Sequence, residues 1–227
     1  MAQPYGRLLV ISVTSRRLAL LGLASVGIIL LGMVVTALAY RGHAGEAYSP
    51  LNHFISELGE ISQSQLAWAV NLGILLGGTG LGAFLLLLSN RIAGRYRITL
   101  VALGIVAGVS GALVGVFPMD YHATHRIVSE IFFVTGWLVA VVVSVWLAAA
   151  PRPTLPRWLI VPGVVAAAVS IVFIAVYSTY HPANPNGPIQ GRPDGLWSFA
   201  FLEWASLLSL LAWFVCVSIA LLRERPE

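Results

Sequence analysis

Six long apolar stretches constrain this chain more than any other feature of its sequence. They run roughly over residues 18–40, 66–88, 98–117, 127–150, 159–180 and 197–222. A helix needs about 20 mostly apolar residues to cross a bilayer, and each stretch has that length. We therefore expect an all-α integral membrane protein, a single domain over residues 1–227 that forms a bundle of six transmembrane helices.

The composition excludes several other classes of protein. Charged residues make up 10% of the chain, whereas a soluble domain has about 25%, and the mean hydropathy is +0.87. All 13 basic residues are arginines scattered along the chain, so we do not expect a nucleic-acid partner. The single cysteine, Cys216, excludes a disulfide within the chain.

The arginine distribution predicts how the helices are oriented. Ten of the 13 arginines flank the helix ends that share a side with the N-terminus, and the other three are Arg41, Arg126 and Arg192. Cytoplasmic loops carry the excess of basic residues in membrane proteins. Both termini are therefore expected in the cytoplasm.

Polar side chains gather on the opposite, outer side. All five histidines lie there: His43, His53, His122, His125 and His181. Glu130, Glu203 and Asn71 fall near the outer ends of apolar stretches. Because ionisable side chains within a membrane span usually face a cavity or a partner, we expect these three to line a pocket that opens outward. For Glu130 the alternative is a surface ion pair with Arg126, four residues earlier.

The first outer loop predicts a short amphipathic helix. Ser49 is a good N-cap, and Pro50 fits the first helical position. Apolar residues then recur at helical spacing, at Leu51, Phe54, Ile55 and Leu58. The polar face carries Asn52, His53, Ser56 and Glu57. Such a helix is either a plain anchor at the membrane surface or a lid that points these polar side chains into the pocket.

The second outer loop places three potential metal ligands close together in the sequence. Asp120, His122 and His125 combine a carboxylate with two imidazoles, a set that can hold zinc or another divalent metal. Two alternatives stay open: hydrogen bonds that tie this loop to His53–Glu57 of the first outer loop or to a lipid phosphate, and general acid–base catalysis by a histidine. A lipid phosphate would bind the guanidinium of Arg126.

Glycines recur at a spacing of four residues in the second and third apolar stretches. The pairs are Gly73 with Gly77, Gly78 with Gly82, Gly104 with Gly108, and Gly111 with Gly115. Small residues at this spacing let membrane helices approach closely. Packing within the chain is the first expectation, and contact between two copies in a homo-oligomer is the alternative.

The order of motifs resembles a known family of membrane proteins. The segment Asn52-His53-Phe54-Ile55-Ser56-Glu57-Leu58-Gly59 is followed by Asn71 in the second span and His125 at the head of the fourth. This order resembles the bacterial and archaeal proteins grouped as domain of unknown function (DUF) 998, and more distantly the six-span Frag/DRAM/Sfk-like proteins of eukaryotes. The resemblance covers nearly the whole chain. It implies a six-helix bundle with a polar outer face in the plasma membrane of a prokaryote, and it makes lipid handling the expected class of function.

Three functions are compatible with these residues. A lipid-modifying enzyme, a hydrolase or acyltransferase, would use His125 or His53 as base and Glu203 or Asp120 to orient it. A binder of lipid headgroups would use the same pocket without catalysis, either alone or as a scaffold for a partner. A small proton-linked carrier would titrate Glu130 and Glu203, although such a site usually lies near the midplane of the membrane.

Overall fold

The computed structural model describes residues 13–42, 45–180 and 193–224, so His43 and His181 lie outside the described residues. The described chain is helical throughout and has no strand. Six of its helices are long and apolar enough to cross a membrane: α1 (Ser15–Ala39), α3 (Ala67–Leu88), α4 (Arg95–Val116), α5 (His122–Ala149), α6 (Ile160–Tyr177) and α7 (Ser198–Leu222). They confirm the six expected spans, and the protein is a multi-pass membrane protein.

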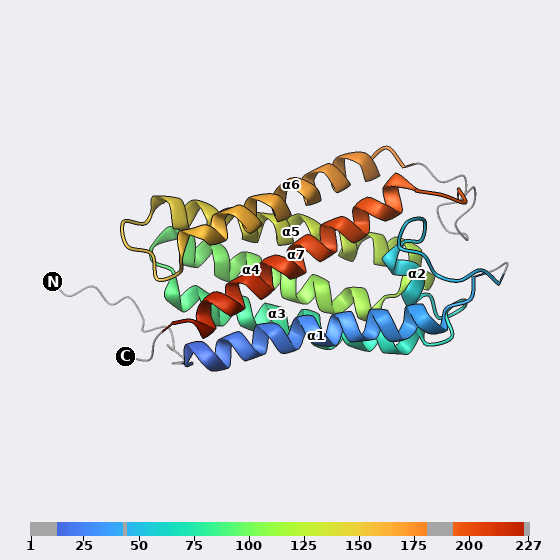
Figure 1. Ribbon diagram of the computed structural model, residues 1–227, viewed down its shortest axis with the longest axis horizontal. Helices are drawn as coiled ribbons and strands as arrows, with labels where there is room; N and C mark the ends of the chain where they lie inside the picture. Colours follow the sequence, from blue (N-terminus) through green and yellow to red (C-terminus); the bar gives the residue numbers. More distant parts are fainter. Residues whose placement is uncertain (1–12, 43–44, 181–192, 225–227) are drawn as a thin grey trace.

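The six long helices form a closed ring through their contacts. Each packs against the next one along the chain, and α7 packs against α1 to close the ring. The short helix α2 (Ile55–Gly59) contacts α1, α3 and α7 at one end of the bundle, which we name the α2 end. The opposite end, named the terminal end, holds the start of α1 and the end of α7 (Figure 1).

A polar cluster joins three segments at the terminal end. Arg91, in the connection between α3 and α4, lies 2.6 Å from a carboxylate oxygen of Glu224 and donates to the Ser15 hydroxyl at 2.8 Å. This half-buried ion pair holds the start of α1 and the end of α7 against the connection that follows α3.

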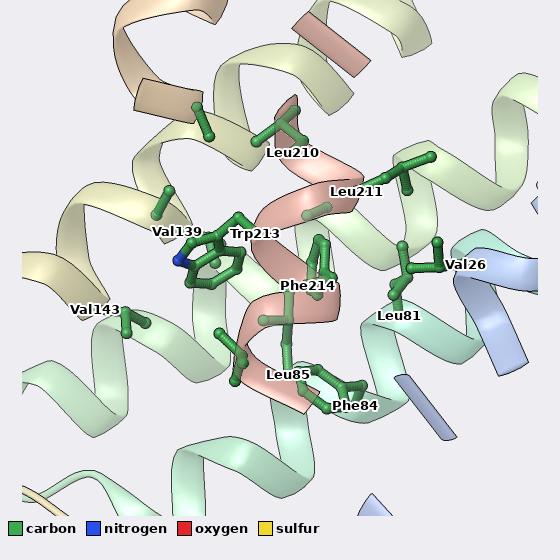
Figure 2. Packing of buried hydrophobic residues seen from close by; sticks show 14 of the residues in the cluster. Val26, Leu81, Phe84, Leu85, Val139, Val143, Leu210, Leu211, Trp213 and Phe214 are labelled. Carbon is green, nitrogen blue, oxygen red and sulfur yellow. The ribbon is translucent and has the colours of Figure 1, made fainter. Parts of the chain in front are cut away.

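Apolar side chains, aliphatic and aromatic, pack together inside the bundle (Figure 2). The rings of Trp213 and Phe214 on α7 lie 5.0 Å apart, and Phe214 meets Phe84 of α3 edge-on at 5.8 Å. All three side chains are buried. Lipid is as apolar as these residues, so their close packing, rather than their removal from water, stabilises the contacts between helices.

The predicted glycine pairs mark contacts within the chain. A Cβ atom added at Gly108 of α4 would lie 2.6 Å from the Cα of Gly82 on α3, and one at Gly78 would lie 2.7 Å from the carbonyl carbon of Gly111. A Cβ at Gly73 would likewise lie 3.0 Å from the backbone of Ile28 on α1. Because neighbouring helices of the same chain cover these glycine faces, a contact between two copies would need another surface.

The helix of the first loop starts later than the sequence predicts. The expected N-cap Ser49 begins a turn instead, in which its carbonyl accepts the N–H groups of Asn52 and His53 at 3.2 and 2.9 Å. Phe54 is extended, with φ −65° and ψ 150°, and α2 begins at the next residue. The helix starts there because the Glu57 carboxylate accepts the Phe54 N–H at 2.7 Å. Leu51, predicted on the apolar stripe, is consequently 50% exposed.

Candidate functional site

A cavity of about 60 Å³ lies beneath α2, lined by residues of α1, α2, α3, α4, α5 and α7. Its polar lining residues are Ser56, Asn71, His125, Ser129 and Glu203. Four of these five were predicted as site residues, and they come from four separate helices. The cavity is larger than a single water molecule requires.

The rest of the lining is apolar and extends away from α2. It includes Ile29 and Met33 of α1, Leu81 of α3, and Leu207 of α7. Asn71 and Leu81 both line the cavity and are separated by about 15 Å along the axis of α3, at 1.5 Å per residue. The cavity therefore has a polar part near the α2 end and a longer apolar part that reaches toward the middle of the bundle.

Glu203 of α7 connects the cavity wall to α2. Its side chain is buried, and its Oε2 accepts the backbone N–H of Ile55 at 2.6 Å. Ile55 is the first residue of α2, so its N–H has no acceptor inside the helix. Glu203 thus satisfies a buried donor of α2 with one oxygen and can present the other to the cavity.

His125 is held in one tautomer. Its Nδ1 lies 2.8 Å from the carbonyl oxygen of Phe117, an atom that can only accept a hydrogen bond. Nδ1 therefore carries the proton, and in the neutral imidazole Nε2 carries the free lone pair. Since His125 lines the cavity, the geometry offers the cavity a hydrogen-bond acceptor or a base.

Two of the other three polar lining residues donate a hydrogen bond to the backbone. Asn71 donates from Nδ2 to the Gly59 carbonyl at 2.9 Å, and Ser129 donates to the His125 carbonyl at 2.7 Å. Ser129 was not predicted, although its position four residues after His125 places both on one face of α5. Within the described residues, no hydrogen bond involves the Ser56 hydroxyl.

His53, Glu57 and Asn52 do not line the cavity. The His53 ring is buried against Tyr40 and Tyr48, and its Nδ1 lies 2.8 Å from Oδ1 of Asn52. Asn52 also donates to the Pro193 carbonyl at 3.0 Å, and Glu57 caps α2. These predicted site residues therefore hold the first loop in shape. Of the polar face, Ser56 alone reaches the cavity.

Tyr48 is a second connection between the first loop and α7 that the sequence reasoning missed. Its hydroxyl donates to the Phe54 carbonyl at 2.9 Å and accepts from Nε1 of Trp204 at 2.9 Å. Burial, together with the nearby acid Glu203, raises the pKa of Tyr48 well above its ordinary value of 10.0. The hydroxyl therefore keeps its proton at physiological pH and remains a donor.

The expected metal ligands are not grouped in the structure. Among the described residues, no three His, Cys, Asp or Glu side chains are arranged to hold a metal ion. Asp120 instead accepts the backbone N–H groups of Ile61 and Ser62 at 2.6 and 3.0 Å, and Nδ1 of His125 is used by Phe117. The Asp120 contacts tie the second loop to the first, but at residues that come after the expected segment His53–Glu57.

Arg126 and Glu130 lie on the surface and away from the cavity lining. Nε of Arg126 donates to Oε1 of Glu130 at 3.1 Å, and the two side chains are 61% and 52% exposed. This arrangement matches the surface pair that the spacing allowed, so Glu130 does not join the pocket with Glu203.

Comparison with known proteins identifies the family. The family model described as "Protein of unknown function (DUF998)" matches residues 23–220, from within α1 to within α7. No curated protein and no solved structure matches the chain at a significant level. The match spans all six long helices and every residue that lines the cavity. The chain belongs to the DUF998 family of proteins, as its order of motifs predicts.

Proposed function

We propose that this protein binds a membrane amphiphile, with the hydrocarbon chain in the apolar part of the cavity and the polar end beneath α2. One observation carries the proposal: a single cavity combines an elongated apolar lining with five polar side chains at one end. Ligand sites in proteins are typically apolar pockets with a few converging polar groups that fix orientation. This division of the lining into polar and apolar residues matches the two parts of an amphiphile.

We further propose that the α2 end faces outward in the plasma membrane of a prokaryote and that both termini are cytoplasmic. The excess of arginines at the terminal end supports this orientation. The cavity would then take its ligand from the outer leaflet, the leaflet nearer to α2.

Lipid hydrolysis or acyl transfer is the second candidate function, and the tautomer of His125 favours it. With Nδ1 bonded to Phe117, Nε2 is free to take a proton from water or from the Ser56 hydroxyl, which would then attack an ester carbonyl. The structure has no hydrogen bond between Ser56 and His125. Binding therefore has the stronger support.

Proton-linked transport has less support from the acids. Glu130 lies in an exposed pair, and Glu203 is bonded to α2 near the same end of the bundle. Neither position is near the middle of its helix, where a carrier site is expected.

Native mass spectrometry of the purified full chain, compared between two variants, tests the proposal. Val114 lines the cavity on α4, and Val109 lies exposed on the same helix. In Val114→Phe the larger side chain fills the cavity, so a lipid that remains bound to the wild-type protein should be lost. Val109→Phe adds the same ring outside the cavity and should retain that lipid. Equal retention in wild type and Val114→Phe would refute binding in this cavity.

A further inference from the structure

We infer that the ligand's polar end is a hydrogen-bond donor, an amine or a hydroxyl, and not a phosphate or a carboxylate. The inference rests on the proposed amphiphile binding and adds the chemical class of the ligand. It follows from the charge of the cavity lining and from which polar atoms there are already used.

No positive side chain lines the cavity. The chain has no lysine, and its lining residues include no arginine. Arg126, the arginine that follows His125 directly, is directed to Glu130 on the exposed surface. A phosphate or carboxylate buried in this cavity would therefore lack an opposite charge, and an unpaired buried anion is costly.

The polar lining atoms that remain available are mostly acceptors. His125 and Ser129 each donate their proton to a backbone carbonyl, which leaves Nε2 and the Ser129 oxygen as acceptors. Asn71 uses one amide proton on Gly59 and keeps its carbonyl oxygen. The remaining donors are the Ser56 hydroxyl and the second amide proton of Asn71. A ligand that donates several hydrogen bonds fits this set, and a ligand that only accepts does not.

Glu203 adds a group suited to a cation. Its Oε2 accepts the Ile55 N–H, which leaves Oε1 for a ligand. An ammonium group in the cavity would stabilise the carboxylate form and gain a charge-assisted hydrogen bond. An amine should therefore bind more tightly than an alcohol with the same chain.

The test compares dodecylamine, dodecanol and dodecanoate, which differ only in the polar end. Each is titrated onto the full chain in phosphatidylcholine nanodiscs, and the occupancy specific to the cavity is taken as the difference between Val109→Phe and Val114→Phe. We expect the affinity order amine, alcohol, carboxylate. Glu203→Gln should weaken the binding of dodecylamine by about tenfold or more and that of dodecanol less. The reason is that a hydrogen bond to a charged group changes the affinity by more than a factor of about ten. Glu130→Gln, an exposed acid on the neighbouring surface, should leave all three unchanged.

The possible outcomes distinguish a failure of this inference from a failure of the proposed function. Dodecanoate binding to the cavity as tightly as dodecylamine would overturn the inference while leaving amphiphile binding intact. Equal weakening of amine and alcohol in Glu203→Gln would also overturn the role of its charge. If none of the probes distinguishes Val109→Phe from Val114→Phe, the proposed function itself fails. The ranking of probes on the wild-type protein is decisive even if Glu203→Gln does not fold.

Discussion

At the scale of single residues, two acids predicted for one pocket have different surroundings. Glu203 is buried and accepts the first N–H of α2, whereas Glu130 is half exposed and pairs with Arg126. Removing a buried acceptor leaves its donor without a partner, while water replaces a lost surface pair. The two positions should therefore respond differently to the same substitution.

Glu203→Leu should destabilise the protein by about 1–3 kcal/mol, because the Ile55 N–H loses its buried acceptor. Glu130→Leu, the matched control, should cost no more than about 0.5 kcal/mol, the usual value of an exposed i,i+4 pair. Unfolding in detergent at increasing denaturant measures both. Equal losses of stability would mean that the bond from Ile55 to Glu203 contributes nothing.

Residue types and spacing could identify much of the candidate site. Polar residues within an apolar stretch are unusual, and this criterion identified Glu203 and Asn71. His125 was identified by its position at the start of a span. Spacing could not decide between the two arrangements of Glu130, because both a local pair and a pocket satisfy it. Likewise His53 and Glu57 have the residue types of a site, but their side chains bond to neighbouring residues of the loop and do not line the cavity.

At the scale of elements, hydrogen bonds from neighbouring segments hold α2 in place. Glu203 binds its first residue and Asn71 its last, and Trp197 donates to the Leu51 carbonyl just before it at 2.8 Å. The Asp120 carboxylate accepts the N–H groups of Ile61 and Ser62, which follow α2. A helix of five residues has little stability of its own, so these contacts determine its position.

Asp120→Ala should loosen the segment after α2. The Ile61 and Ser62 amides lose their acceptor and should exchange with deuterium faster, at a local cost of about 1 kcal/mol because water reaches this site. Hydrogen exchange of the full chain measures the change. His122→Ala removes a neighbouring side chain and should leave these amides unchanged. Unaltered exchange in Asp120→Ala would show that other contacts hold the segment.

Helix contact through glycine gives a second prediction at this scale. Gly108→Ala places a methyl group 2.6 Å from the Cα of Gly82, so α3 and α4 must separate, at a cost of about 1–3 kcal/mol. Nothing lies within 4 Å of a Cβ at Gly27 of α1, so Gly27→Ala should be neutral or gain up to about 1 kcal/mol from helix propensity. Thermal unfolding in detergent compares them, and a harmless Gly108→Ala would refute the close approach.

Sequence patterns predict the positions of the long helices well and that of α2 poorly, for a physical reason. A long apolar stretch in a membrane has only one stable form, because every backbone group must be bonded within the helix. The first loop is not constrained in this way. There Ser49 could cap a helix or close a turn, and the bonds from Phe54 to Glu57 and from Ile55 to Glu203 of α7 select the turn.

At the scale of the whole molecule, the closed ring creates the cavity. Contact between α7 and α1 brings Glu203 and Leu207 opposite Ile29 and Met33. Hydropathy predicts the number of helices but not which of them meet across a ring. Four of the five polar lining residues could be predicted from the sequence, and the apolar part of the cavity could not.

Cysteine labelling in intact cells tests the proposed orientation. In a Cys216→Ala background, Gln65→Cys at the α2 end and Ala93→Cys at the terminal end both place a thiol at an exposed position. A maleimide that cannot cross the membrane should label Gln65→Cys and should reach Ala93→Cys only after the cells are permeabilised. The reverse pattern would place the cavity near the cytoplasmic leaflet.

The central claim is that a membrane amphiphile occupies the cavity beneath α2. Photo-crosslinking tests it most directly, using a dodecyl probe with a diazirine at the end of its chain and the full chain in nanodiscs. The account predicts labelling at the deep apolar lining, on Met33, Leu81 or Leu207, that excess unlabelled probe suppresses and Val114→Phe abolishes. Labelling that is unaffected by competitor and confined to residues exposed on the outside of the bundle, such as Leu31, Ile98 and Val161, would contradict it.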